Sequence, residues 1–152
     1  MRPAAVPRIM KPLILATLIA FAITLHCHAD PKAPDKPAAG EAKVPAGVDP
    51  KLTSEDADYG YSREKPIKVG SKDEFGGPKA ERAYLDSLRD EAGKGVTYHR
   101  QGSVGAGPDG NILDLYEVKT STGRTLGLYI DMYHPKNDPK KQLAPKGLFK
   151  AK

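Results

Sequence analysis

Cysteine is almost absent from this chain, and this excludes several kinds of site. Of 152 residues only Cys27 is a cysteine, and it lies near the end of the apolar N-terminal segment. If that segment is removed on export, neither a disulfide nor a zinc site with cysteine ligands can form. Lipidation of Cys27 is an alternative, but His26 stands where a bacterial lipoprotein carries a small residue. We therefore expect soluble export rather than a lipid anchor.

Acidic residues are absent from the first 29 positions, as is typical of a secretory signal. Basic residues open this segment, and residues 13–25 are apolar apart from two threonines. A run of that length matches the core of a signal peptide, whereas a membrane span needs about 20 apolar residues. We predict a signal peptide over residues 1–29, cleavage after Ala29, and a periplasmic or secreted protein without a stable membrane span.

A strong excess of one charge is also lacking. Loss of Arg2, Arg8 and Lys11 with the signal lowers the number of Lys and Arg from 24 to 21, against 19 Asp and Glu, so the net charge falls from +5 to +2. No basic stripe is interleaved with aromatic residues, and nucleic-acid binding is not expected. The lysine-rich tail at 135–152 is predicted to be solvated, with Leu143, Leu148 and Phe149 holding its end to the core, and contact to an anionic lipid or polymer is the alternative.

Large apolar residues are scarce between residues 30 and 58, where proline, alanine and lysine dominate. Such a segment cannot bury enough surface to offset the entropy of ordering it. We predict a disordered tether over 30–58 and a single domain over 59–149.

Within that domain the pattern predicts an α+β fold. Residues 66–70 have the alternation of a strand. Pro78 is suited to the first turn of a helix, an apolar stripe at helical spacing runs from Ala80 to Ala92, and Gly93 or Gly95 ends the helix. Three further strands, at 96–104, 112–120 and 125–134, are separated by turn signals. We expect a small antiparallel sheet of three to four strands with one helix packed across it.

The strand at 112–120 alternates less regularly than its neighbours. Leu113 and Leu115 share a face with Glu117 and Lys119, so apolar and charged side chains are mixed on one side. A β-bulge or a second covered face of the sheet explains this pattern, and the sequence leaves both open.

Tyrosines and carboxylates form the candidate ligand face. Tyr129, Asp131 and Tyr133 alternate with apolar residues that are expected to face the helix, and Tyr116 and Asp114 on the neighbouring strand are expected to join them. Aromatic rings beside a carboxylate can stack on a sugar or hold a cation, although tyrosines also cover half-exposed sheets. The predicted face consists of Tyr116, Tyr129, Asp131, Tyr133, Asp114 and His99.

Catalytic groups are few. After export only His99 and His134 remain as histidines, and with Asp131 they are the sole candidates for acid–base chemistry. Alternation places His134 on the helix side and His99 on the other side. No Gly-x-Ser-x-Gly elbow occurs, and the glycine-rich stretch at 102–107 is followed by a strand rather than by the helix that a phosphate loop needs. We predict no catalytic residue, no metal site and no cofactor.

Five short motifs carry a resemblance. They lie at 59–62 (YGYS), 66–70 (PIKVG), 100–103 (RQGS), 115–118 (LYEV) and 129–133 (YIDMY). Together they resemble a group of small exported bacterial proteins of unknown function. Some of these carry the label 2-dehydro-3-deoxyphosphooctonate aldolase, but a barrel aldolase takes about 250 residues, so that activity is not expected here.

These observations lead to one expected function and two alternatives. We expect a non-enzymatic binding or interaction module of the cell envelope, with a protein or glycan partner. A small extracytoplasmic enzyme is the first alternative. An inhibitor or immunity-type protein that neutralises another protein is the second.

Overall fold

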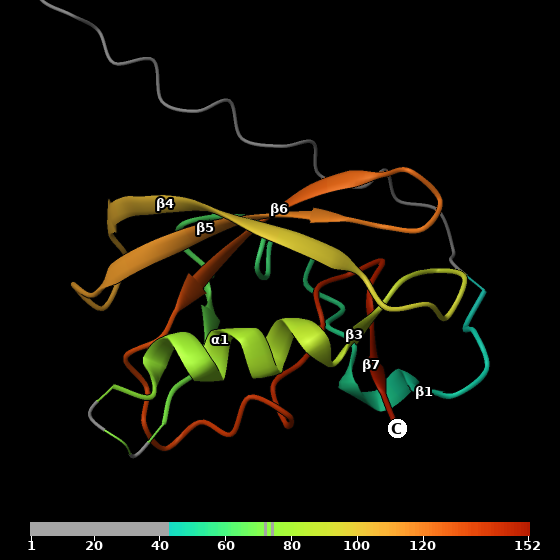
Figure 1. Ribbon diagram of the computed structural model, residues 1–152, viewed down its shortest axis with the longest axis horizontal. Helices are drawn as coiled ribbons and strands as arrows, with labels where there is room; N and C mark the ends of the chain where they lie inside the picture. The colour runs from blue at the N-terminus through green and yellow to red at the C-terminus, as the bar shows by residue number, and fades with distance from the viewer. Residues whose placement is uncertain (1–42, 72, 74) are drawn as a thin grey trace, which may run out of the picture. The chain divides into compact units, whose positions relative to one another are not determined.

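A four-stranded sheet with one helix across it forms the centre of the fold (Figure 1). The computed structural model describes residues 43–71, 73 and 75–152. The predicted signal peptide and the first part of the predicted tether, residues 30–42, lie outside the described residues. Among the described residues, no helix is long and apolar enough to cross a membrane.

The sheet consists of the predicted strands and confirms the α+β class. Strands β4 (Thr97–Ala106), β5 (Ile112–Lys119) and β6 (Thr125–Asp131) are antiparallel neighbours. The short strand β2 (Ile67–Lys68) pairs with β6 in the parallel direction, so the sheet order is β2-β6-β5-β4. The β5–β6 turn is tight because Gly123 adopts φ +90°, which glycine reaches without a Cβ clash.

Helix α1 (Gly77–Asp86) begins as predicted, with Pro78 in its first turn, but it ends earlier than the apolar stripe suggested. Leu88 was expected to be helical and instead starts β3 (Leu88–Arg89). The main chain of β3 pairs with residues 149–150, and these bonds replace the helical ones. The stripe correctly identified Leu88 as a core residue, since it is fully buried.

A second, three-stranded sheet was not predicted. Its central strand is β7 (Phe149–Ala151), which pairs with β3 on one side and with β1 (Val48–Asp49) on the other. A 3-10 turn at Pro50–Leu52 follows β1. One expectation is therefore wrong: residues 43–58 are not part of a disordered tether. The tail is solvated only in part, because Leu148 and Phe149 are buried and hold its end to the core as expected, whereas Leu143 is 37% exposed.

Both faces of the four-stranded sheet are covered. On the helix side, Leu126, Leu128 and Ile130 pack with Tyr84 and Leu85 of α1. On the opposite side a smaller apolar cluster contains Leu113, Leu115 and Tyr129, with Val104 against it. A second covered face accounts for the irregular pattern of β5, and β4 carries the bulges, at residues 100–102 and 103–106.

Candidate functional site

The strand register divides the predicted ligand face between the two sides of the sheet. Across the β5–β6 pair, Asp114 lies opposite Ile130 and Tyr116 lies opposite Leu128. Because directly opposed residues share a face, Asp114 and Tyr116 lie on the helix side, while Tyr129, opposite Leu115, lies on the other side. The expectation that Tyr116 and Asp114 join Tyr129 is therefore wrong.

Most of the predicted face is also inaccessible. Asp131 is fully buried, and Tyr116, Asp114 and Tyr129 are buried as well. His99 is exposed on β4, where it pairs with Glu117. Only Tyr133 remains as a large exposed ring among the predicted residues, with half of its surface accessible. A broad tyrosine surface is therefore not what the fold presents.

On the helix side, polar contacts instead join the buried Asp114 to exposed residues of β4 and the buried Tyr116 to the helix. The Arg100 guanidinium donates from Nε and Nη2 to the two oxygens of Asp114, at 2.5 and 2.7 Å, and Ser103 Oγ donates to the same carboxylate. The Tyr116 hydroxyl donates to Glu81 of α1. Glu81 is 1% exposed, and its burial raises its pKa to about 7. The Tyr116–Glu81 contact lies at the packed interface between sheet and helix, which fits a structural role better than contact with a substrate.

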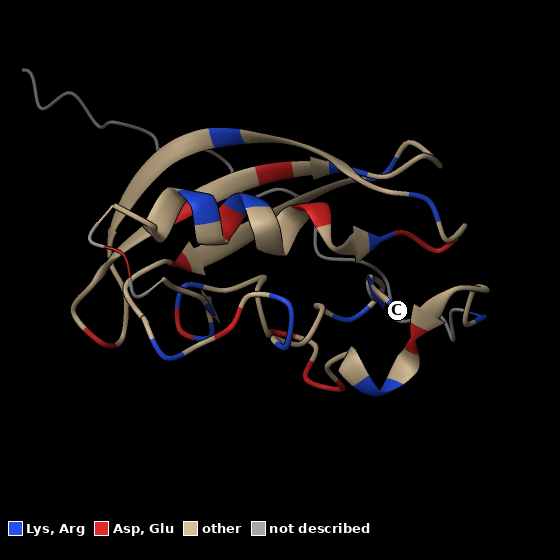
Figure 2. Cartoon of the chain, turned by 60° about the horizontal axis from the view of Figure 1, so that its bottom comes forward, with Lys and Arg blue, Asp and Glu red and all other residues tan. Residues whose placement is uncertain are grey.

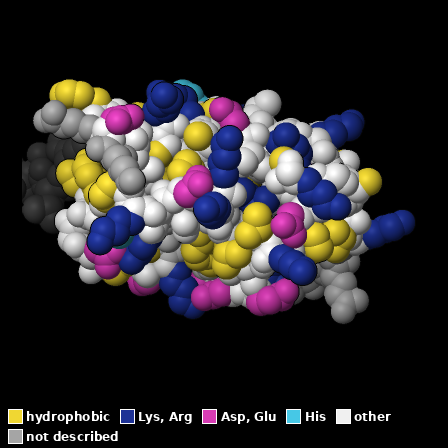
Figure 3. All heavy atoms as spheres, turned by 90° about the horizontal axis from the view of Figure 1, so that it is seen from below, with side chains coloured by type: hydrophobic (Ala, Val, Ile, Leu, Met, Phe, Trp, Pro, Cys, Tyr) yellow, Lys and Arg dark blue, Asp and Glu magenta, His cyan; other side chains and the backbone are white. Residues whose placement is uncertain are grey.

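The surroundings of these contacts carry no concentration of one charge. Figure 2 shows both basic and acidic residues along α1 and the strands. Figure 3 shows the two kinds of residue interspersed on the face seen from below. Neither view shows the continuous basic stripe that nucleic-acid contact requires.

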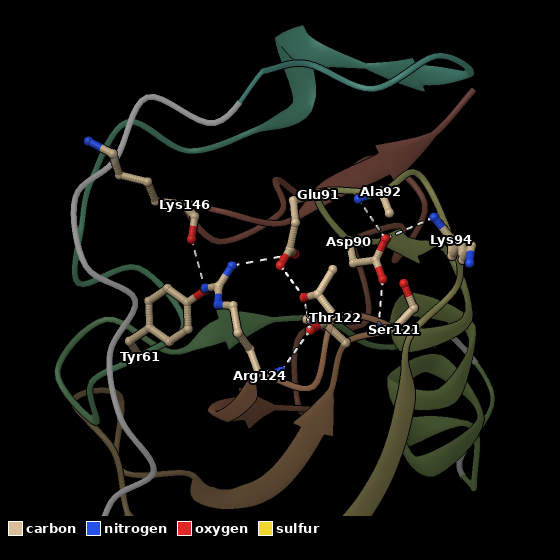
Figure 4. A network of polar contacts seen from close by, with 10 residues as sticks. Tyr61, Asp90, Glu91, Ala92, Lys94, Ser121, Thr122, Arg124 and Lys146 are labelled. Atoms are coloured by element: carbon tan, nitrogen blue, oxygen red, sulfur yellow. Dashed lines mark hydrogen bonds and ion pairs between the residues drawn. The ribbon is translucent and has the colours of Figure 1, made fainter.

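A second polar network fastens the β5–β6 turn to the segment after β3 (Figure 4). The buried Asp90 carboxylate accepts hydrogen bonds from the main-chain N–H groups of Ala92, Lys94 and Ser121, at 2.9, 2.9 and 2.7 Å. Burial alone raises the pKa of Asp90, but these donors outweigh it and hold the pKa below its ordinary value. Beside it, Glu91 contacts Thr122 and, at 3.4 Å, Arg124. Since these bonds join backbone segments, we read the network as structural.

The end of β6 gathers the chemically most distinctive group of side chains. His134 Nε2 lies 2.9 Å from Asp131 Oδ2 and 3.4 Å from Asp109 Oδ2. Asn111 Nδ2 donates to both oxygens of Asp131, at 3.3 and 3.1 Å. Of the two predicted histidines, the structure brings His134 to Asp131 and leaves His99 beside Glu117 on the β4 edge of the sheet.

The placement of His134 on the helix side was wrong because the strand ends too soon. β6 stops at Asp131, so alternation no longer determines the direction of residue 134. The main chain then runs beside β2, where Val69 accepts a hydrogen bond from the N–H of His134. Sequence reasoning missed Asp109 and Asn111 because they lie in the β4–β5 loop, with no periodic pattern to indicate their direction.

An apolar hollow lies beside this group, and the sequence did not suggest it. It has a volume of about 560 Å³ and lies between the loop before α1, the start of α1 and the segment after β6. Phe75, 88% exposed, and Tyr133, 50% exposed, are the two aromatic residues among the exposed large hydrophobic side chains of the described residues, and both line it. The remaining lining residues are Ser71, Asp73, Gly77, Pro78, Met132 and Pro135.

Comparison with known proteins adds no family to these observations. No family model matches the chain, and neither the curated proteins nor the solved structures contain a match. The resemblance carried by the five motifs therefore stays an expectation.

Proposed function

We propose that this protein is a non-enzymatic, exported binding module that takes an N-acetylated glycan of the cell envelope in the hollow beside Tyr133. The observation that carries the proposal is the convergence of Phe75 and Tyr133 on one hollow. Exposed aromatic rings are costly to leave in water, and two on one concavity favour a ligand with flat apolar faces.

The chemistry of the lining supports a sugar as that ligand. The C–H faces of a pyranose ring are apolar and can stack on the rings of Phe75 and Tyr133. Met132 and Pro78 offer apolar contact for an acetamido methyl group, and Asp73 offers a carboxylate to the hydroxyl groups. The volume of about 560 Å³ falls within the range of small-ligand sites, roughly 300–1,000 Å³.

An oligosaccharide titration followed by amide NMR tests the proposal. Chitotriose and soluble peptidoglycan fragments are added to the ¹⁵N-labelled full chain. We expect shift changes confined to residues 71–78 and 132–135. Phe75→Ala and Tyr133→Ala should each weaken binding about fivefold, since one stacked ring contributes about 1 kcal/mol.

Val44→Ala is the matched control, because Val44 is as exposed as Tyr133 but does not line the hollow. It should leave the affinity unchanged. Absence of shift changes at millimolar sugar, or changes centred elsewhere, would refute the glycan proposal.

A small enzyme is the second candidate, favoured by the 2.9 Å approach of His134 to Asp131. Incubation of the same sugars with the chain, followed by mass spectrometry, tests it. Turnover that is abolished by His134→Gln and retained by His99→Gln would replace the binding proposal with a catalytic one.

A further inference from the structure

Three side chains of metal-ligand type converge at the end of β6. Asp131 comes from the last position of β6, His134 from the segment that follows, and Asp109 from the β4–β5 loop. One ligand atom of each lies within 4.8 Å of the others. Carboxylate oxygen and imidazole nitrogen are both ordinary ligands of divalent first-row metals.

The contacts within this group are short, but those of His134 are not hydrogen bonds. Nε2 of His134 is buried and lies 2.9 Å from Asp131 Oδ2, yet among the described residues it has no hydrogen-bond partner. A short separation without a hydrogen bond is typical of two ligands of one cation, because the lone pair of each ligand points at the cation and not at the other ligand. In such a site the neighbouring oxygen lies about 45° away from the nitrogen–metal direction, so an N–H···O bond is poorly aligned.

The two separations measured from His134 also match those of ligands on a shared ion. With metal–ligand distances of about 2.0–2.2 Å, two ligands are about 2.8–3.1 Å apart at an octahedral edge and about 3.3–3.6 Å apart at a tetrahedral edge. The nitrogen of His134 lies 2.9 Å from one carboxylate oxygen and 3.4 Å from the other. A single cation can therefore contact all three side chains after small adjustments.

Further groups hold the carboxylates in place, as outer partners of metal ligands do. Asp131 accepts hydrogen bonds from Asn111 and, at 3.0 Å, from the N–H of Tyr133. Lys68 Nζ lies 2.5 Å from Asp109 Oδ2, which orients this exposed loop carboxylate. Since a carboxylate has about four lone-pair sites, Asp109 can keep Lys68 and still bind a cation.

The charge of the group favours a cation. Two carboxylates against one ammonium leave a net negative charge when His134 is neutral. The imidazole directs the preference toward zinc-like ions, since calcium and magnesium favour all-oxygen sites.

We propose that Asp109, Asp131 and His134 form a binding site for one Zn²⁺-like divalent cation, with the remaining coordination positions open to water or to a ligand. The site adjoins the glycan hollow but does not depend on it, since none of its three ligands lines that hollow.

The test measures Zn²⁺ binding by the full chain in competition with a chromophoric chelator. Because His26, Cys27 and His28 also attract zinc, every chain carries the substitutions H26Q, C27S and H28Q. We expect one Zn²⁺ per chain. His134→Gln and Asp109→Asn should each weaken binding at least about tenfold, which is the lower end for loss of an outer partner of a ligand.

His99→Gln is the matched control, because it removes the other histidine of the described residues and leaves the three ligands intact. It should bind Zn²⁺ as the parent does. Circular dichroism establishes that each variant is folded, and the shift of the His134 imidazole resonances on adding Zn²⁺ to the parent requires no variant at all. No saturable binding in a large excess of Zn²⁺, equal binding by His134→Gln, or unchanged His134 resonances would overturn the proposal. Failure of the sugar titration leaves these results unaffected.

Discussion

The hydroxyl of Tyr116 on β5 donates a hydrogen bond of 2.9 Å to Oε2 of Glu81 on α1. The other oxygen of Glu81 is buried and has no hydrogen-bond partner among the described residues. A carboxyl group in this setting is more stable when protonated, which is why burial raises the pKa of Glu81 to about 7. The contact joins the sheet to its helix, and its strength depends on pH.

Glu81→Gln should remove part of the pH dependence of folding. The pKa of Glu81 is raised from 4.5 to about 7 in the folded protein, so its stabilising effect is complete below pH 4.5 and is lost as the pH rises through 7. The free energy of unfolding of the wild type should fall by on the order of 2–3 kcal/mol over that interval, relative to the Gln variant. Urea unfolding at several pH values measures this. Glu117→Gln, at a half-exposed site, is the control and should show the same dependence of the free energy of unfolding on pH as the wild type. If Glu81→Gln also shows the wild-type dependence, Glu81 is not the group responsible.

Asp90→Asn should destabilise the fold by about 2 kcal/mol, because a neutral amide accepts the three main-chain N–H groups less well than a carboxylate. The pKa of Asp90 is lowered in the folded protein, so its contribution is present above pH 3.8 and is lost as the pH falls further, through the lowered value. Thermal unfolding at pH 7 and in acid measures both effects. Asp73→Asn in an exposed loop is the control, and an equal loss in the two variants would count against the network of Figure 4.

Lys150→Met should remove a change in the stability of the protein at alkaline pH. Lys150 is 1% exposed at the centre of the small sheet, with Nζ 4.3 Å from the centre of the Tyr84 ring. Burial lowers its pKa from 10.5 to about 8, so the charged form is disfavoured in the folded state. Stability should therefore rise between pH 8 and 10.5 in the wild type relative to Lys150→Met. The difference between the two unfolding curves isolates this group, and Lys152→Met should behave as the wild type does.

Gly70→Ala should destabilise the protein by more than about 2 kcal/mol, because a Cβ at this position would lie 2.4 Å from the main-chain carbonyl of His134. Backbone cannot move aside as a side chain can, so the segment that carries His134 must shift. Chemical denaturation measures the loss, and the zinc affinity should fall with it. Gly95→Ala is the control, since its nearest neighbour is a flexible Arg89 atom at 3.9 Å. Equal stability of both variants would show that residues 70 and 134 are not in close contact.

The strands of the main sheet could be predicted because their information is local. β4, β5 and β6 are seven to ten residues long, rich in β-formers and separated by turns that contain glycine. The two-residue alternation of a strand is therefore repeated several times in each and can be recognised in the sequence. The small sheet could not be predicted in the same way. β1, β3 and β7 have two or three residues each, and their pairing joins Val48 and Leu88 to the last residues of the chain. No local pattern encodes contacts of that separation.

The candidate site, too, could be predicted only where local alternation places its residues. Alternation within β5 correctly grouped Asp114 with Tyr116, but the choice between the two faces required the register that sets Tyr116 opposite Leu128. The convergence of Asp109 and His134 required the loop and the end of β6 to meet, which no spacing in the sequence expresses.

The class of fold, its main strands, the start of its helix and the scarcity of groups for redox or thiolate chemistry could all be predicted, because these follow from composition and short-range periodicity. The packing of the folded chain sets which side chains are buried, which face each tyrosine occupies, and that His134 meets Asp131 and Asp109. Those outcomes depend on register and on the ends of strands, where a shift of one residue turns a side chain to the opposite face.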